Sequence, residues 1–169
     1  KFHNATYLVS SSNDSVIHLW DINSQGKSIN SYHDHSNEVG GLDVNEQNGN
    51  FFATGSGDTT VKLWDIREKK ACVCTFKGSD SSVSCVKFLP GRYTTLAAGS
   101  EDSLIRIYDL RALKELALLK QKADCNNCIS SLCFSKSGQL LFASSSKSYT
   151  ISIWDIFNDS NEPVAIYND

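Results

Sequence analysis

The sequence lacks methionine altogether, and its first residue is a lysine. Because translation starts at methionine, we expect the chain to be a piece of a longer protein. No apolar run approaches the roughly 20 residues that span a bilayer, and no secretory signal is present, so we expect no direct membrane insertion. The net charge is −3, and neither sign forms a long block. A dedicated nucleic-acid or membrane-surface binder needs a basic face, so nucleic acid is not an expected partner.

The six cysteines do not indicate a disulfide framework. Most of them lie within apolar alternation, where a free cysteine behaves as a small buried hydrophobe, and this favours a reducing compartment. Cys125 and Cys128 have the spacing of half a zinc site or of a redox pair. Zinc takes about four ligands, however, and no second pair or nearby histidine follows. We therefore expect neither a metal nor another cofactor.

One pattern recurs four times along the chain. It reads VIHLWDI, VKLWDI, LIRIYDL and ISIWDI, and its aromatic residues are Trp20, Trp64, Tyr108 and Trp154. Successive copies are therefore 44, 44 and 46 residues apart. A fixed period in this range predicts a repeat architecture in which each unit buries its faces against its neighbours.

Short β-rich runs separated by turn residues divide each repeat into four strands, which predicts an all-β fold of propeller blades. The segment RALKELALLKQK favours helix by propensity, but the period demands a strand, and we predict one at Leu116–Leu119. The expected blades are an incomplete first blade and three complete ones, forming part of a seven-bladed ring. Their boundaries are 1–33, 34–77, 78–121 and 122–169.

The second repeat contains four residues that predict a buried polar chain. His35 precedes the first strand, Thr54 lies in the second, Asp58 in the following turn, and Trp64 in the third. A histidine between a carboxylate and a hydroxyl, with the hydroxyl also bound to an indole N–H, leaves no polar group without a partner. This constellation, in phase with the repeat, resembles the WD-repeat family of β-propellers.

The resemblance extends unevenly to the other repeats. The first has Ser10, Asp14 and Trp20, and its histidine position would precede residue 1. The third retains Asp102 but has Ser79, Ala98 and Tyr108 where the family has His, Ser and Trp. The fourth keeps Ser144 and Trp154 but places Cys125 and Ser148 at the His and Asp positions. We therefore expect apolar packing to hold the third and fourth blades together.

Thr54, His35 and Asp58 also have the composition of a hydrolase triad, with hydroxyl, base and carboxylate. The blade network is the favoured interpretation, because in a WD blade the chain ends on Trp64 inside the protein. The segment GSGD also lacks the Gly-Lys-Ser/Thr that completes a phosphate-binding loop. We expect no enzymatic activity. Function is then grafted onto the loops that the blades present.

Among WD-repeat proteins, the chain is most similar to the beta subunit of heterotrimeric G proteins, from that family's third blade into its sixth. The segments that carry this similarity are NDSVIHLWDI at 13–22, GDTTVKLWDIRE at 57–68, YDLRALKEL at 108–116 and ISSLCFSKSGQLLFA at 129–143. The resemblance implies a signal-transducing platform that binds gamma and alpha subunits and effectors. It also implies a cytoplasmic location, at the inner face of the plasma membrane through a lipidated partner.

Residue by residue, the family's partner contacts fall on Glu38, Gly40, Gly57, Ser82, Ser84 and Glu101. Glu38 and Glu101 keep an acid of the family's pattern, whereas Ser82 has lost one, and Gly40 replaces a large apolar residue. Such a surface suits basic or polar partner residues. The competing interpretation is a WD-repeat scaffold or adaptor of another multiprotein complex.

Overall fold

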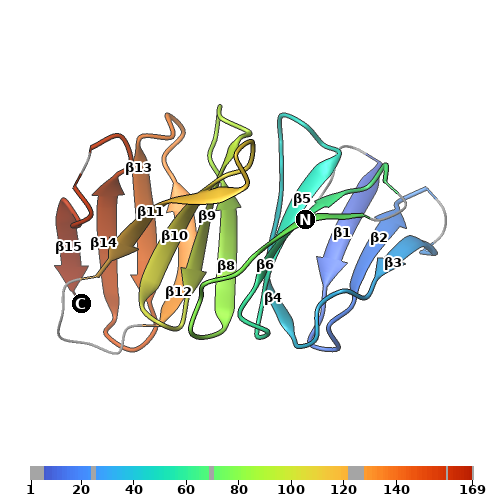
Figure 1. Ribbon diagram of the computed structural model, residues 1–169, viewed down its shortest axis with the longest axis horizontal. Coiled ribbons are helices and arrows are strands. Elements are labelled where there is room, and N and C mark those ends of the chain that lie inside the picture. Colours follow the sequence, from blue (N-terminus) through green and yellow to red (C-terminus); the bar gives the residue numbers. More distant parts are fainter. Residues whose placement is uncertain (1–5, 24–25, 69–70, 122–127, 159, 169) are drawn as a thin grey trace.

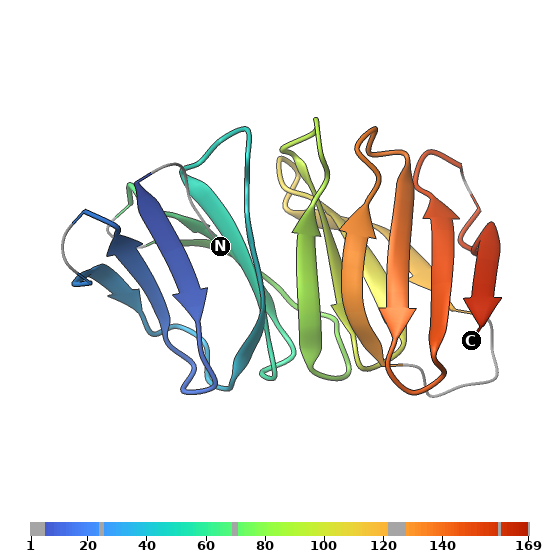
Figure 2. The ribbon, with the colours of Figure 1, turned by 180° about the vertical axis from the view of Figure 1, so that it is seen from behind.

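The computed structural model describes residues 6–23, 26–68, 71–121, 128–158 and 160–168. All its regular elements are β-strands, arranged in four separate antiparallel sheets that follow one another along the chain. Figures 1 and 2 show the sheets standing side by side, the first at one end and the fourth at the other. Within the described residues, no helix has the length and apolarity that crossing a membrane requires.

Each sheet is one blade, and its strands are ordered as they occur in the sequence. The first has three strands and the others have four. Blade 1 consists of β1 (Tyr7–Ser11), β2 (Ile17–Asp21) and β3 (Ser28–Tyr32), and blade 2 of β4 (Val39–Val44), β5 (Phe51–Ser56), β6 (Val61–Asp65) and β7 (Cys72–Phe76). Blade 3 consists of β8 (Val83–Phe88), β9 (Thr95–Ser100), β10 (Leu104–Asp109) and β11 (Lys114–Lys120), and blade 4 of β12 (Ile129–Phe134), β13 (Leu140–Ser145), β14 (Thr150–Asp155) and β15 (Ala165–Asn168).

The predicted all-β propeller class is confirmed. A strand covers Leu116–Leu119 as predicted, within the longer β11, despite the helical propensity of that segment. Its pairing with β10 supplies the tertiary context that overrides local preference. The propeller here is incomplete, with β4, β8 and β12 as neighbouring inner strands.

Apolar side chains form a separate core at each junction between blades. Trp64 and Phe52 stack in parallel between blades 1 and 2, with ring centroids 5.6 Å apart. Tyr108 and Phe76 make the corresponding contact between blades 2 and 3, at 4.5 Å. Trp154 is fully buried in the third core, between blades 3 and 4. The repeating aromatic of the sequence is therefore the central packing residue of each junction.

The second strand of a blade approaches the inner strand of the next blade closely at Gly55 of β5 and Gly99 of β9. A Cβ on Gly55 would lie 2.6 Å from Cγ1 of Val83, and one on Gly99 would lie 2.4 Å from Cγ2 of Ile129. Asp43 of β4 also joins blade 2 to blade 3 through hydrogen bonds. Its carboxylate accepts from Lys87 Nζ at 3.0 Å and from the amide of Phe88 at 3.1 Å. The blades are thus joined by backbone proximity as well as by aromatic packing.

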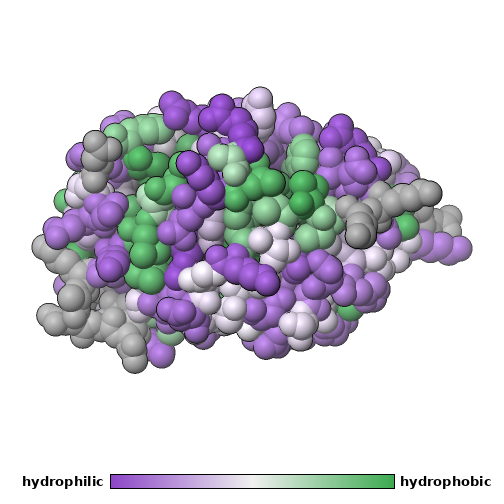
Figure 3. All heavy atoms as spheres, in the orientation of Figure 1, coloured by the Kyte–Doolittle hydropathy of each residue, from purple (hydrophilic) through white to green (hydrophobic). Residues whose placement is uncertain are grey.

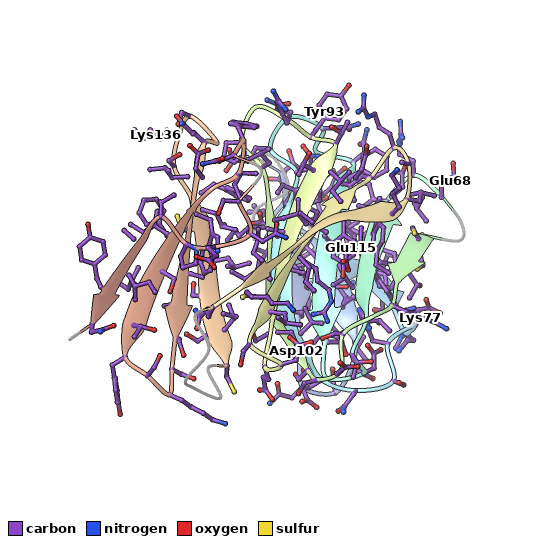
Figure 4. The ribbon with its side chains drawn as sticks, turned by 60° about the vertical axis from the view of Figure 1, so that its left-hand side comes forward. Glu68, Lys77, Tyr93, Asp102, Glu115 and Lys136 are labelled. Atoms are coloured by element: carbon purple, nitrogen blue, oxygen red, sulfur yellow. The ribbon has the colours of Figure 1, made fainter. Side chains whose placement is uncertain are left out.

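The strands run between two ends of the molecule, which we call the upper and lower rims. The lower rim carries the β5–β6, β9–β10 and β13–β14 turns. The upper rim carries the β4–β5, β8–β9 and β12–β13 turns. Figure 4 shows Asp102 and Lys77 at the lower rim, and Tyr93, Lys136 and Glu68 at the upper rim.

Candidate interaction rim and the polar network beneath it

The four predicted residues of blade 2 lie within hydrogen-bond distance in one chain. Trp64 Nε1 is 2.8 Å from Thr54 Oγ1, which is 2.7 Å from His35 Nε2, and His35 Nδ1 is 2.7 Å from Asp58 Oδ2. The chain crosses from β6 to β5 and then reaches the loop before β4 and the β5–β6 turn. It therefore fastens the lower rim to the interior of the blade.

The Trp64 indole at one end of the chain can only donate, and the ionised Asp58 carboxylate at the other end can only accept. These two groups fix the position of each proton between them. An indole N–H can only donate, so Thr54 Oγ1 accepts from Trp64 and gives its own proton to His35 Nε2. His35 then carries its proton on Nδ1 and donates it to Asp58. The imidazole is neutral in this arrangement, and each polar atom has a partner, as a buried network requires.

Electrostatics agree with a neutral histidine. Burial lowers the pKa of His35, and this outweighs the opposing effect of the Asp58 carboxylate. Burial by itself would raise the pKa of Asp58, but donation from Thr60, His35 and the Ser36 amide lowers it to about 2. Asp58 is therefore ionised, and His35 uncharged, at neutral pH.

The same geometry gives no support to the triad. Thr54 is completely buried, and its hydroxyl is already shared between Trp64 and His35. A nucleophile needs a face from which a substrate can approach it. Absence of catalysis stays a prediction, and the observed role of these groups is to hold the blade. His33, next but one to His35, is exposed.

Asp14, Asp58 and Asp102 play one common part in the turns. The Oδ1 atom of each accepts from the amide two residues later, at 3.0 Å in all three cases. The residue between has a left-handed backbone, with φ of 67°, 68° and 70° in blades 1 to 3. The carboxylate stabilises a turn that non-glycine residues rarely adopt. In blade 1, Ser10 also accepts from Trp20 Nε1 at 2.8 Å.

Blade 3 replaces the histidine chain with a buried ion pair that the sequence analysis did not identify. Arg106 Nη1 lies 2.8 Å from Asp102 Oδ2, and Nη2 donates to the carbonyl of Gly78 at 2.7 Å. Ser79, at the histidine position, donates from its hydroxyl, which lies 2.7 Å from Ser100 Oγ and 3.1 Å from Asp102. Ala98 and Tyr108 are buried in the apolar core instead.

A sequence signal for Arg106 does exist. His18, Lys62 and Arg106 occupy the same position of the repeated motif, 44 residues apart. Lys62 Nζ is 2.8 Å from Asp34, and the Lys62 side chain is largely buried. His18 Nδ1 lies 2.8 Å from Ser31 Oγ, so in each of these three blades the basic residue at this position makes a polar contact with a residue outside its own strand.

Blade 4 contradicts one of the expected assignments. Trp154 pairs with Leu141, so the residue that faces its indole is Ala143 and not Ser144. Ser144 points to the opposite face, where its hydroxyl lies 3.0 Å from Ser130 Oγ. A shift of one residue reverses the face of a strand, which is why the assignment of Ser144 was wrong. Trp154 Nε1 has no acceptor among the described residues.

The structure describes one of the two remaining expected positions of blade 4. Ser148 lies 2.7 Å from Thr150 through their hydroxyls, which corresponds to the contact between Asp58 Oδ1 and the Thr60 hydroxyl in blade 2. Cys125, expected at the histidine position, lies outside the described residues. Without a histidine chain, this blade is held by the apolar cluster around Trp154.

The expected partner contacts gather at the lower rim and beside it on the inner strands. The amide of Gly57 donates to the carbonyl of Glu38 at 2.9 Å, and the amide of Glu101 donates to the carbonyl of Ser82 at 2.9 Å. These are equivalent pairs in blades 2 and 3. One residue of each pair is an exposed glutamate, so blades 2 and 3 each present one carboxylate at the lower rim.

Two of the expected contact residues, Gly57 and Ser84, have structural roles. Gly57 lies under the Glu38 side chain, and a Cβ there would be 2.5 Å from Glu38 Oε1. Ser84 donates its hydroxyl to the carbonyls of Ile129 and Gly99, so it joins blade 3 to blade 4. Gly40 is exposed on β4, and a Cβ there would meet only the Ser84 carbonyl, at 3.6 Å. The side chains left to meet a partner are above all those of Glu38 and Glu101.

Comparison with family models gives a match over residues 1–167, to the nucleolar protein 10-like N-terminal β-propeller domain. The chain belongs to this family. The match spans all four blades and accords with the WD-like propeller resemblance of the repeats. No curated protein matches the chain. A β-propeller fold suggests a scaffold for protein interactions, so protein partners are the general expectation.

Membership in the nucleolar protein 10-like family corrects two expectations. The closer resemblance to G-protein beta subunits is not supported, and neither are gamma and alpha subunits as partners or a role in receptor signalling. The expected cytoplasmic location at the inner face of the plasma membrane is wrong, because the family points to the nucleolus. The misleading segments YDLR and FSKSG belong to turns and strand ends that a different propeller can also use.

Proposed function

We propose that this propeller is a non-catalytic scaffold of a nucleolar multiprotein complex, and that its lower rim binds a basic or polar surface of a protein partner. The observation that carries the proposal is the presentation of Glu38 and Glu101 on equivalent, hydrogen-bonded loop pairs of adjacent blades. Beneath them, the His35 chain and the Arg106–Asp102 pair stiffen the rim. A rigid surface loses little conformational freedom on binding.

The charge of this rim supports a basic partner. Asp80 adds an exposed acidic residue beside Glu38 and Glu101, Asp34 is exposed but paired with Lys62, and Lys77 is a nearby basic residue. Complementary charge of this kind raises the association rate and fixes the orientation of the partner more than it raises the affinity. We therefore expect the complex to form more slowly as salt concentration rises.

The experiment compares charge-reversed variants of the full-length protein. Glu38→Lys combined with Glu101→Lys reverses the lower rim, whereas Glu68→Lys makes the same kind of change on the upper rim (Figure 4). Tagged proteins are purified from nucleolar extracts, and the copurifying proteins are quantified by mass spectrometry. The identified partner is then measured by surface plasmon resonance at two salt concentrations.

We expect the double variant to lose a defined set of partners that wild type and Glu68→Lys retain, with the loss expressed mainly in the association rate. Its thermal unfolding temperature should match that of wild type, because both carboxylates are exposed. An unchanged partner set would refute the assignment of the lower rim. A lowered unfolding temperature would make the two glutamates structural.

A further inference from the structure

The upper rim has an apolar pocket between blades 2 and 3, which we call the blade 2–3 pocket. Its volume is about 230 Å³. Phe51, Leu63 and Leu110 form apolar walls, Tyr93 and Val73 flank the opening, and Arg111 contributes the positive charge. Two of these residues are apolar side chains left largely exposed, Tyr93 at 56% and Val73 at 45%. A hollow of this kind accepts an apolar side chain from a partner.

Hydrogen bonds across the blade junction hold the pocket open in one shape. The buried Asn45 donates from Nδ2 to the carbonyl of Tyr93 at 3.2 Å, and its Oδ1 accepts from the amides of Gln47 and Asn48. On the far side, the amide of Leu110 donates to the carbonyl of Thr94 at 2.8 Å. The walls therefore come from two blades but are fixed to each other, so little ordering is needed on binding.

The one charged side chain among the described residues that line the pocket is that of Arg111. No described residue that lines it is acidic. The 110–113 turn that carries Arg111 contains no acidic residue, whereas Arg92 of the 89–94 turn lies over the Phe157 ring at 4.7 Å and does not line the pocket. The Arg111 side chain is 75% exposed, so its guanidinium remains open to solvent although its Nε lies 3.6 Å from Asp109 Oδ1. Arg67 lies over Phe51 at 5.7 Å, but Asp65 holds it in two hydrogen bonds and compensates its charge.

We infer that the blade 2–3 pocket binds an acidic peptide segment of a protein partner, with one apolar side chain buried beside Tyr93 and Val73 and a carboxylate paired with Arg111. An arginine fork recognises a carboxylate through two parallel hydrogen bonds, and an exposed tyrosine supplies contact area at small entropic cost. This site lies on the rim opposite Glu38 and Glu101, and its charge is opposite to theirs. It is thus independent of the function proposed for the lower rim.

The test measures fluorescence anisotropy of a fluorescein-labelled peptide, EEDLFEE, with the full-length protein. Two further peptides separate the contributions: EEDAAEE lacks the apolar anchor, and KKKLFKK carries the opposite charge. We expect EEDLFEE to bind, with an affinity that falls as salt rises, and the other two to bind at least about tenfold more weakly.

Variants locate the binding on the protein. Arg111→Glu and Tyr93→Ala should each raise the Kd for EEDLFEE about tenfold or more, as expected for anchor residues. Lys136→Glu makes the same charge reversal elsewhere on the upper rim, and Tyr149→Ala removes an exposed tyrosine from the lower rim; both should leave the Kd within about twofold. All four side chains are exposed, so we expect these substitutions to leave the fold unchanged.

Equal binding of the three peptides, or equal loss in Lys136→Glu and Arg111→Glu, would overturn the proposal. So would binding of a uridine oligonucleotide that Arg111→Glu abolishes while EEDLFEE fails to compete, because the pocket would then serve nucleic acid. Charge reversal at Glu38 and Glu101 should not affect peptide binding. The two proposals can therefore fail separately.

Discussion

Trp64 donates its indole N–H to the hydroxyl of Thr54 at 2.8 Å across the β5–β6 pair, and both side chains are almost completely buried. In blade 4 the corresponding pair is Trp154 and Ala143, and the indole N–H has no described acceptor. The same aromatic thus closes a polar network in one blade and only fills space in another. This difference gives the first prediction.

Ala143→Ser should stabilise the protein, because it places a hydroxyl where Ser10 and Thr54 stand in blades 1 and 2. The gain expected for one satisfied buried hydrogen bond is about 0.5–1.5 kcal/mol. Urea unfolding of the full-length protein measures it. Ser144→Ala is the matched control and should change stability by less than about 0.5 kcal/mol, as an outward-facing substitution does. A larger effect at Ser144 than at Ala143 would contradict the register described for blade 4.

His35→Ala should destabilise the full-length protein by about 1–3 kcal/mol, because Thr54 and Asp58 both lose a buried partner. Urea unfolding again provides the measurement, with His33→Ala as the exposed control. If the two variants unfold alike, the hydrogen-bonded chain does not contribute to stability. Loss of a chemical turnover at unchanged stability would instead revive the hydrolase interpretation.

Stability should fall as the pH drops below about 6.5, the ordinary pKa of histidine. Burial lowers the pKa of folded His35, so the unfolded chain takes up a proton first, and acid favours unfolding. The contribution of Asp58 has the same sign but a lower window. It is complete above an ordinary pKa of 3.8 and is lost toward the folded value of about 2.

The urea midpoint, measured from about pH 7.5 to about pH 5, tests the histidine part of this profile. His35→Gln should flatten the wild-type decline in that range, since glutamine does not titrate. The three other histidines remain in both proteins, so the difference between the two curves isolates His35. Parallel curves would show that His35 titrates alike in the folded and unfolded states.

Gly55→Ala and Gly99→Ala should each destabilise the junction between blades, by about 1–3 kcal/mol for an overpacked core. Their added Cβ atoms would lie 2.6 Å from Val83 and 2.4 Å from Ile129. Gly40→Ala is the control, because its Cβ would meet nothing nearer than 3.6 Å. Combining Gly55→Ala with Val83→Ala should restore part of the loss. Absence of rescue would assign the strain to the Val83 backbone carbonyl, which would lie 2.9 Å from the Cβ added at Gly55.

The sequence predicted the polar chain of blade 2 because every member has a fixed offset from Trp64. The same offsets failed in blade 4. The separation between the tryptophan and the residue facing it is one residue longer there, from Ala143 to Trp154, and spacing alone placed Ser144 in that role. A motif counted back from the tryptophan does not detect this extra residue, which reverses the face on which each side chain lies.

By itself the sequence determined the repeat, the antiparallel order of the strands and the aromatic that packs at each junction between blades, because these follow from local alternation and a fixed period. The contact role of the lower-rim residues stays a prediction, because it came from a resemblance that the family match does not support. Only the tertiary structure decided which charges meet across blades. Asp43 with Lys87, Ser84 with Ile129, and Tyr93 with Phe51 in the blade 2–3 pocket join residues about one repeat apart, and the period alone does not say which of them meet. Contacts between blades depend on how sheets stack, and the pattern within one blade does not encode that geometry.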